Sequence, residues 1–246
     1  MSEARSVNLP DQAPVTADAQ SKDDLLSAAR FIDSDVPAIK VFANAVTAGA
    51  DEEKDKVLRL YRAIRDDIVY DPYVNFSDPS NFRASGVLAS GRGFCIGKAA
   101  LLAAATRAIG VPARVGYADV RNHLTSRRLY ERIKTDIFIW HSYADLHVCG
   151  RWVKATPAFD LALCERVGIK PLEFDGENDS LFHPFDREGR RHMEYLRDRG
   201  TFADVPFETI QEAFSHAYPS LMTGTVLRGD FRSEAVAAVA DEQAPA

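Results

Sequence analysis

The chain has 246 residues, of which 46% are hydrophobic and 27% are charged, a balance that supports a folded core and argues against wholesale disorder. Its formal net charge of -6 argues against a dedicated nucleic-acid-binding protein, because phosphate contacts need a basic surface. Three cysteines are too few, and odd in number, for a disulfide framework. Residues 1–15 lack the apolar run of a secretory signal, and the apolar helical run 99–105 is too short to cross a bilayer. We therefore expect a cytoplasmic protein with reduced thiols.

The two ends of the chain differ in composition from the region between them. Residues 1–22 are rich in Ala, Ser, Asp, Gln and Pro without periodicity, which predicts a mobile N-terminal arm. Residues 223–246 are polar and Ala-rich, which predicts a loosely held C-terminal tail. Residues 23–222 contain no internal repeat and no obvious linker, so we expect them to form a single domain.

The first strongly periodic segment predicts a helix over residues 51–67. Val57, Tyr61 and Ile64 recur at helical spacing, and acidic residues fill the first turn, where they favour the helix dipole. The following segment, 71–93, is rich in Asn, Ser, Asp and Gly and is predicted to be a loop.

A second helix is predicted to begin near Cys95. It is apolar nearly all round from residue 99 to residue 105, which indicates a buried central helix. Gly110 and Pro112 end it, since glycine commonly follows a helix and proline cannot continue one.

Strands are predicted next, over residues 113–120, 137–148 and 151–156. A charged excursion, 122–134, separates the first two, and Cys149-Gly150 joins the last two as a hairpin. Helices are predicted again over 187–199, whose charges suggest a solvated face, and over about 206–217. Because helices precede and follow an antiparallel sheet, the predicted fold class is α+β.

Cys95 is the main candidate for chemistry, because it lies where a glycine-containing turn runs into a helix. Gly91 and Gly93 allow the backbone to bend tightly before the thiol. The free N–H groups and dipole at a helix N-terminus favour the thiolate, which is the nucleophilic form. The N–H of Cys95 would also point towards the oxygen of a tetrahedral intermediate. A buried structural cysteine is the alternative interpretation.

His141 is the candidate base. Along the predicted strand, positions 139, 141, 143, 145 and 147 share one mixed face, and the alternate positions form the core face. An imidazole on the mixed face could line a cleft, take the thiol proton and return it to a leaving group. The other histidines are interpreted as surface or structural residues: His123, His147, His183, His192 and His216.

A third group should orient the imidazole. If two residues form the hairpin turn, Tyr143 pairs with Thr156, which then shares the face of His141 and offers a hydroxyl. Asp160 lies four residues further on and could fold back towards His141, whereas Asp145 points along the sheet. We assign Asp160 as the third member and keep Thr156 as the alternative.

These residues resemble the transglutaminase-like superfamily of cysteine enzymes. The resemblance covers roughly residues 51–160 and rests on four motifs, in chain order: the helix ending in Ile68-Val69-Tyr70-Asp71; Cys95-Ile-Gly-Lys-Ala-Ala-Leu-Leu with Arg107-Ala-Ile-Gly-Val-Pro-Ala-Arg114; His141-Ser-Tyr-Ala-Asp145; and Trp152-Val-Lys-Ala-Thr156-Pro157. It implies a papain-like core with a Cys-His-Asp triad and acyl-enzyme chemistry on amides. Carried over, Cys95 is the nucleophile and His141 the base, but the family's Asp position holds Thr156, which is a departure.

The sequence thus predicts a thiol enzyme that acts on amide bonds of a peptide or protein through a Cys95 acyl-enzyme. Water as acceptor makes it a peptidase or amidase, which we favour, and an amine as acceptor makes it a transglutaminase. The alternatives are a catalytically weak or inactive peptide-binding module, which Thr156 supports, and a biosynthetic acyltransferase. We expect no cofactor, metal, nucleic acid or membrane partner, and the sequence does not indicate an oligomeric state.

Overall fold

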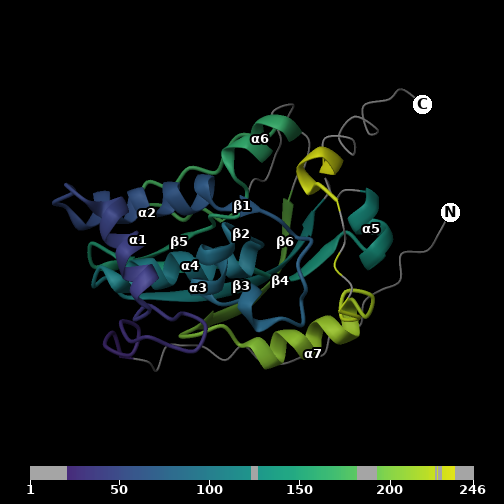
Figure 1. Cartoon of the computed structure of the whole chain (residues 1–246), viewed down its shortest axis with the longest axis horizontal. Helices are drawn as coiled ribbons and strands as arrows, with labels where there is room; N and C mark the ends of the chain where they lie inside the picture. Colours follow the sequence, from purple (N-terminus) through teal and green to yellow (C-terminus); the bar gives the residue numbers. More distant parts are fainter. Residues whose placement is uncertain (1–20, 123–126, 182–192, 225, 227–228, 236–246) are drawn as a thin grey trace.

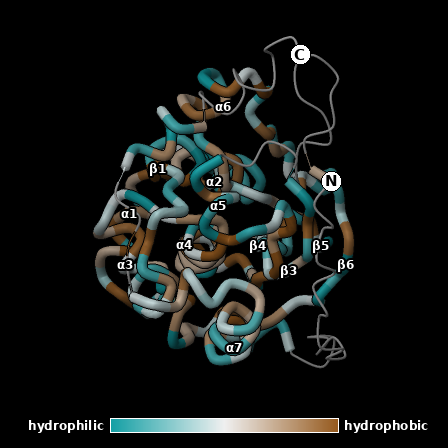
Figure 2. The backbone as a smooth tube through the Cα atoms, turned by 90° about the vertical axis from the view of Figure 1, so that its right-hand side faces the viewer, coloured by the Kyte–Doolittle hydropathy of each residue, from teal (hydrophilic) through white to brown (hydrophobic). Residues whose placement is uncertain are grey.

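The sheet at the centre of the fold has four antiparallel strands in the order β5-β4-β3-β6. A computed structural model describes residues 21–122, 127–181, 193–224, 226 and 229–235 of the chain. The strands are β3 (Ala113–Asn122), β4 (Ile137–Val148), β5 (Arg151–Ala155) and β6 (Met193–Phe202). Helix α4 (Cys95–Ala108) lies in the middle of the molecule, against β4 and β3 (Figures 1 and 2). The α+β prediction, with a central helix on an antiparallel sheet, is confirmed.

The remaining helices surround this core (Figure 1). They are α1 (Pro37–Thr47), α2 (Glu53–Asp67), α3 (Ala84–Ser90), α5 (Arg127–Ile133), α6 (Leu161–Val167) and α7 (Phe207–Ala217), with a short 3-10 turn at Pro79–Asn81. A two-stranded parallel pair, β1 (Val69–Tyr70) and β2 (Arg92–Gly93), leads into α4. Helix α4 contacts α1, α2 and α3 on the side away from the sheet, which explains why its sequence is apolar all round.

Gly97 lets the first turn of α4 approach its neighbours closely. A β-carbon added at this position would lie 2.5 Å from the carbonyl oxygen of Asn81 and 2.7 Å from the side chain of Val87. Any larger residue would therefore push α4 away from the chain before α3. This packing fixes the position of the helix end that carries Cys95.

The hairpin between β4 and β5 has the predicted two-residue turn. Val148 pairs with Arg151, and both turn residues are left-handed, Cys149 at φ 48° and Gly150 at φ 87°. Strand β5 ends at Ala155, opposite Ala144, and Thr156 follows immediately. The hairpin therefore sets the level at which Thr156 leaves the sheet.

Two local predictions differ from the structure. The segment 71–93 is not one loop, since α3 forms within it and ends at Gly91, which has φ 65°. The helix predicted over 187–199 is wrong over its described part, because residues 193–202 form the edge strand β6 paired with β3. Pairing with a neighbouring strand here overrides the local preference of a charged segment for helix. Residues 187–192 lie outside the described residues.

The described part of the C-terminal segment contacts the domain. The ring of Phe231 lies 5.6 Å from the rings of both Tyr70 and Tyr73. Arg232 forms an ion pair with Asp160 at 2.8 Å, and Glu234 accepts a hydrogen bond from the hydroxyl of Tyr73. The predicted N-terminal arm, apart from residues 21 and 22, and tail residues 236–246 lie outside the described residues.

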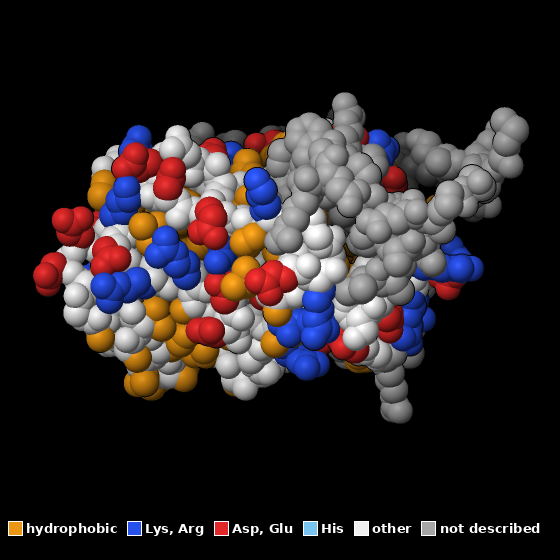
Figure 3. Space-filling model, turned by 90° about the horizontal axis from the view of Figure 1, so that it is seen from above, with side chains coloured by type: hydrophobic (Ala, Val, Ile, Leu, Met, Phe, Trp, Pro, Cys, Tyr) orange, Lys and Arg blue, Asp and Glu red, His pale blue; other side chains and the backbone are white. Residues whose placement is uncertain are grey.

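The surface seen from above carries acidic and basic side chains side by side, with small apolar areas between them (Figure 3). Neither charge sign dominates this face. Within the described ranges, no helix is both long enough and apolar enough to span a bilayer.

Candidate active site

Cys95 is the first residue of α4, directly after the extended residue Phe94. The residue is half-buried, and burial raises the pKa of its thiol to about 11. Hydrogen bonds from the backbone N–H groups of Ser142, Ile96 and Cys95 itself act in the opposite direction, because they stabilise the thiolate. Burial is the larger effect, so the resting thiol is protonated at neutral pH.

His141 lies on β4 and is 8% exposed. Burial lowers the pKa of its imidazole to about 4, so the ring is neutral at pH 7. Its Nε2 atom is buried and has no hydrogen-bond partner among the residues that the structure describes. A neutral imidazole with a free ring nitrogen has the capacity to accept a proton.

One cavity connects the two candidates, because Cys95 and His141 both line it. Its walls are mostly aromatic and aliphatic, and none of its described lining residues is Asp, Glu, Lys or Arg. The larger side chains around it are Tyr70, Phe76, Phe94, Phe138, Trp140, Phe159, Phe214, Tyr218 and Phe231. The structure thus places a thiol and an imidazole, 46 positions apart in the chain, at one apolar cavity.

The predicted alternation along β4 is correct beyond His141. Ala144, Leu146 and Val148 are completely buried in the main core. Tyr143 and Asp145 lie on the opposite face with residues of the neighbouring strands, where Asp145 pairs with Arg114 at 2.7 Å. His141 has the same odd-numbered alternation as that second face, yet it lines the cavity. The strand is irregular just before it.

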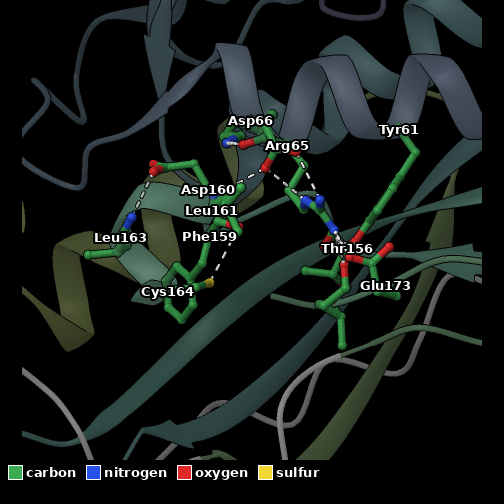
Figure 4. A network of polar contacts seen from close by, with 12 residues as sticks. Tyr61, Arg65, Asp66, Thr156, Phe159, Asp160, Leu161, Leu163, Cys164 and Glu173 are labelled. Atoms are coloured by element: carbon green, nitrogen blue, oxygen red, sulfur yellow. Dashed lines mark hydrogen bonds and ion pairs between the residues drawn. The ribbon is translucent and has the colours of Figure 1, made fainter. Parts of the chain in front are cut away.

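Asp160 is buried and its carboxylate is engaged at several atoms (Figure 4). It caps the N-terminus of α6, accepts from the N–H of Leu163 at 2.9 Å and from the N–H of Tyr70 at 2.9 Å, and pairs with Arg232 at 2.8 Å. Among the described residues, no hydrogen bond or ion pair joins it to His141. The structure therefore shows Asp160 as a helix cap that also holds β1 and the C-terminal segment.

Thr156, the alternative third member, is also buried, and its Oγ1 atom has no hydrogen-bond partner within the described chain. Its backbone is fixed instead: its N–H donates to the carbonyl of Ser180 at 2.9 Å, and its carbonyl accepts from the hydroxyl of Tyr61 at 3.2 Å (Figure 4). Among the described residues, no hydrogen bond joins Thr156 to His141. Neither predicted third member thus orients the imidazole by a hydrogen bond.

The other predicted residues have ordinary surroundings. His147 stacks edge-on against Trp152, and His216 lies against the carbonyl of Glu212 one turn earlier in α7. His123, His183 and His192 lie outside the described residues. Within the described ranges, no three His, Cys, Asp or Glu side chains gather as a metal site would require.

Residues 40–157 match the family model of the transglutaminase-like superfamily. The chain is thus similar to that superfamily over slightly less than half of its length. The matched segment contains α4 with Cys95 and β4 with His141, so the resemblance drawn from the four motifs is confirmed. No curated protein matches the chain.

Solved structures with a similar arrangement include a candidate cysteine protease from Cytophaga hutchinsonii, at 19% identity and a TM-score of 0.45 over 76% of this chain and 49% of that one. A candidate protease from Parabacteroides distasonis matches at 21% identity and a TM-score of 0.38, over 55% of this chain and 26% of that one. The chain thus spans about half of the first relative and about a quarter of the second.

Asp119 and Arg199 are the residues near the site that sequence reasoning missed. They form a buried ion pair directly beside the irregularity in β4. The available signal was an aspartate inside an apolar strand, since such a residue is seldom fully buried without a partner. Arg199 gave no signal, because it was assigned to a solvated helix.

Proposed function

We propose that this protein is a thiol-dependent acyl-transfer enzyme that acts on amide bonds, with Cys95 as nucleophile and His141 as general base. The observation that carries this proposal is the shared cavity, which holds a thiol at a helix N-terminus and a neutral imidazole with a free nitrogen. The match of residues 40–157 to the transglutaminase-like superfamily supports the same chemistry.

In the proposed reaction the neutral pair reacts without first forming an ion pair. The Cys95 sulfur attacks the amide carbonyl carbon as its proton passes to His141, and the carbonyl oxygen takes the negative charge. Backbone N–H groups at the start of α4 would stabilise that charge. The carbon–nitrogen bond then breaks, and the imidazolium returns the proton to the leaving amine, which leaves a thioester on Cys95.

The second half-reaction releases the acyl group. Water attacks the thioester carbonyl while His141 takes one of its protons, the carbon–sulfur bond breaks, and the thiolate recovers the proton. We favour water as acceptor because it is always present, which makes the enzyme a peptidase or amidase. A primary amine in place of water would give transglutamination by the same steps.

The cavity also indicates the kind of substrate. Its described lining carries no formal charge and is rich in aromatic rings. A charged group next to the scissile bond would lose its hydration there without a partner, whereas an aliphatic or aromatic group would gain from burial. We therefore expect a peptide or protein amide with an uncharged, apolar group on its acyl side.

A non-catalytic peptide-binding module is the second candidate. Two observations favour it: the thiol pKa is raised, not lowered, and the family's aspartate position is Thr156. Both would weaken catalysis, because the thiolate is scarce and no carboxylate fixes the imidazole tautomer.

A reporter ester separates these two functions. Incubation with a p-nitrophenyl ester should give a burst of p-nitrophenolate equal to the enzyme concentration, and mass spectrometry should find the acyl group on the Cys95 peptide. The burst should disappear in Cys95→Ala, slow strongly in His141→Ala, and persist in the matched control Cys149→Ser, which changes an exposed thiol. No burst above the Cys95→Ala background would remove the enzyme assignment and leave the binding module. Peptide p-nitroanilides then test whether amides are cleaved.

A further inference from the structure

The ladder between β3 and β4 is broken immediately before His141. At this point Asp119 alone on β3 faces two residues of β4, Ile139 and Trp140. Trp140 has φ 59°, a left-handed conformation that is strained for a residue with a large side chain. A bulge of this kind bends a strand and changes the direction of the side chains beside it.

The two backbone N–H groups of the bulge are satisfied by side chains. The N–H of Ile139 donates to the hydroxyl of Tyr218 at 2.8 Å, and that hydroxyl donates to the carbonyl of Ile137 at 2.7 Å. The N–H of Trp140 donates to Oδ1 of Asp119 at 3.1 Å. A side-chain carboxylate thus replaces the backbone partner that a regular ladder would supply.

Asp119 is itself held by Arg199. The guanidinium donates to both carboxylate oxygens, with Nε at 2.5 Å from Oδ1 and Nη2 at 2.8 Å from Oδ2, and both residues are buried. Arg199 is the extra residue of a second irregularity, between β3 and β6, and it is followed by Gly200 at φ 81°. Its guanidinium also lies 4.8 Å from the ring of Trp140.

We propose that Asp119, clamped by Arg199, is a positioning residue for His141: it holds the left-handed turn at Trp140 that brings the imidazole to the cavity lined by Cys95. Neither Asp160 nor Thr156 bonds to the imidazole among the described residues, and Nε2 has no partner. The backbone at Trp140 therefore orients the imidazole, the role that a carboxylate has in a complete triad. In Asp119→Asn the side chain is neutral and one acceptor oxygen becomes an NH2 group, which cannot accept from the Arg199 guanidinium. The clamp that fixes the acceptor of the Trp140 N–H is then lost, and residue 140 is free to leave the strained conformation.

Asp145 offers a matched control for this inference. It is also a buried aspartate in a pair with an arginine across β3 and β4, Arg114, but it lies four residues beyond His141 and away from the bulge. We therefore compare Asp119→Asn with Asp145→Asn, and include Arg199→Lys, which keeps the charge but loses the two-pronged contact. Arg199→Lys also tests the inference if Asp119→Asn does not fold.

Two measurements are made on the full-length chain. The first is the position of the His141 ring signals in NMR spectra of histidine-labelled protein, assigned with His141→Gln. The second is the rate of Cys95 acylation by a p-nitrophenyl ester, which rests on the proposed function. We expect Asp119→Asn to move the His141 ring signals and to slow acylation at least about tenfold, because small misplacements of a catalytic group are costly. Arg199→Lys should produce a smaller change of the same kind, and Asp145→Asn should leave both readouts at the wild-type values.

The NMR signals test the positioning role of Asp119, and the acylation rate of His141→Ala tests the proposed function, so the two can be rejected independently. Ring signals of His141 that stay at the wild-type positions in folded Asp119→Asn, or in folded Arg199→Lys if only that variant folds, would overturn the positioning role, whatever the acylation rate. Equal displacement by Asp145→Asn would also overturn it, because any buried ion pair of the sheet would then have the same effect. If His141→Ala acylates as fast as wild type, the proposed function fails, and the NMR comparison still decides whether Asp119 places the ring.

Discussion

The ammonium group of Lys98 donates a hydrogen bond to the carbonyl oxygen of Ile68 at 2.6 Å in the interior of the protein. A second bond from the same group reaches the carbonyl of Arg65 at 2.9 Å. These are carbonyls at the end of α2, which lack helical partners, so a side chain from α4 caps a different helix. Because Lys98 lies one turn after Cys95, this contact fixes α2 against the helix turn that begins with Cys95.

Replacing Lys98 with Met should therefore destabilise the fold. The change keeps most of the side-chain volume but leaves two buried carbonyls without a donor, at an expected cost of about 2–4 kcal/mol. Part of this loss is offset, because Lys98→Met also removes the cost of burying an ammonium group. That cost lowers the pKa of Lys98 to about 7. Urea unfolding measures the effect. Lys40→Met, on an exposed position of α1, is the control and should change the free energy of unfolding by less than about 0.5 kcal/mol. Equal stability of the two variants would contradict the capping role.

Replacing Asp160 with Ala should lower stability much more than it slows acylation. The variant loses the α6 cap, the bond to Tyr70 and the pair with Arg232, which together should cost about 2–4 kcal/mol in the free energy of unfolding. The acylation rate constant of the folded protein should stay within a few-fold of wild type, since no hydrogen bond or ion pair joins Asp160 to His141 in the described chain. Thermal unfolding and the ester burst measure the two quantities. A loss of several orders of magnitude in acylation at unchanged stability would restore Asp160 as the third catalytic member.

Alkylation of Cys95 should show a thiol that titrates at high pH. Because burial raises its pKa to about 11, the rate with iodoacetamide should rise about tenfold per pH unit from pH 7 to pH 10, without a plateau. The measurement is made in a Cys149→Ser background, since Cys149 is exposed and would also react. A rate that levels off near neutral pH would instead indicate a thiolate paired with an imidazolium, and would contradict the neutral resting pair.

His141 should make the protein less stable in mild acid. Its pKa in the folded state is about 4, below the ordinary value of 6.5, so between these values the unfolded chain binds a proton that the folded chain does not. Stability is therefore lost as the pH falls from about 6.5 to about 4, by up to about 3 kcal/mol, and regained as the pH rises. His141→Gln should remove this part of the pH dependence of the unfolding free energy, whereas His147→Gln, at a half-buried position, should retain it. Identical pH profiles for wild type and His141→Gln would show that the imidazole is not buried in its neutral form.

The sequence alone predicted those features that depend only on residues close together in the chain. Val57 and Ile64 mark α2 by their spacing, and the alanine-rich run after Cys95 marks a helix buried on all sides, because each pattern reflects which faces must leave water. Gly150 indicated the hairpin, since glycine at the second turn position tolerates the left-handed backbone that such a turn requires. Together these features determined the fold class, the helix that begins at Cys95 and the strand that carries His141.

Only the tertiary structure decided what surrounds those groups. The sequence suggested that Asp160 could orient the imidazole. In the structure its carboxylate instead accepts hydrogen bonds from α6 and β1 and pairs with Arg232, and its position in the chain indicates none of these contacts. The local sequence that ends at Arg199 predicts a charged helix, but in the structure it pairs with β3 as a strand. That pairing brings Arg199 into contact with Asp119, next to the bulge before His141. Local sequence sets conformational preference and hydrophobic faces, whereas burial of charge and the strain at Trp140 arise from contacts between residues distant in the chain, which no local pattern encodes.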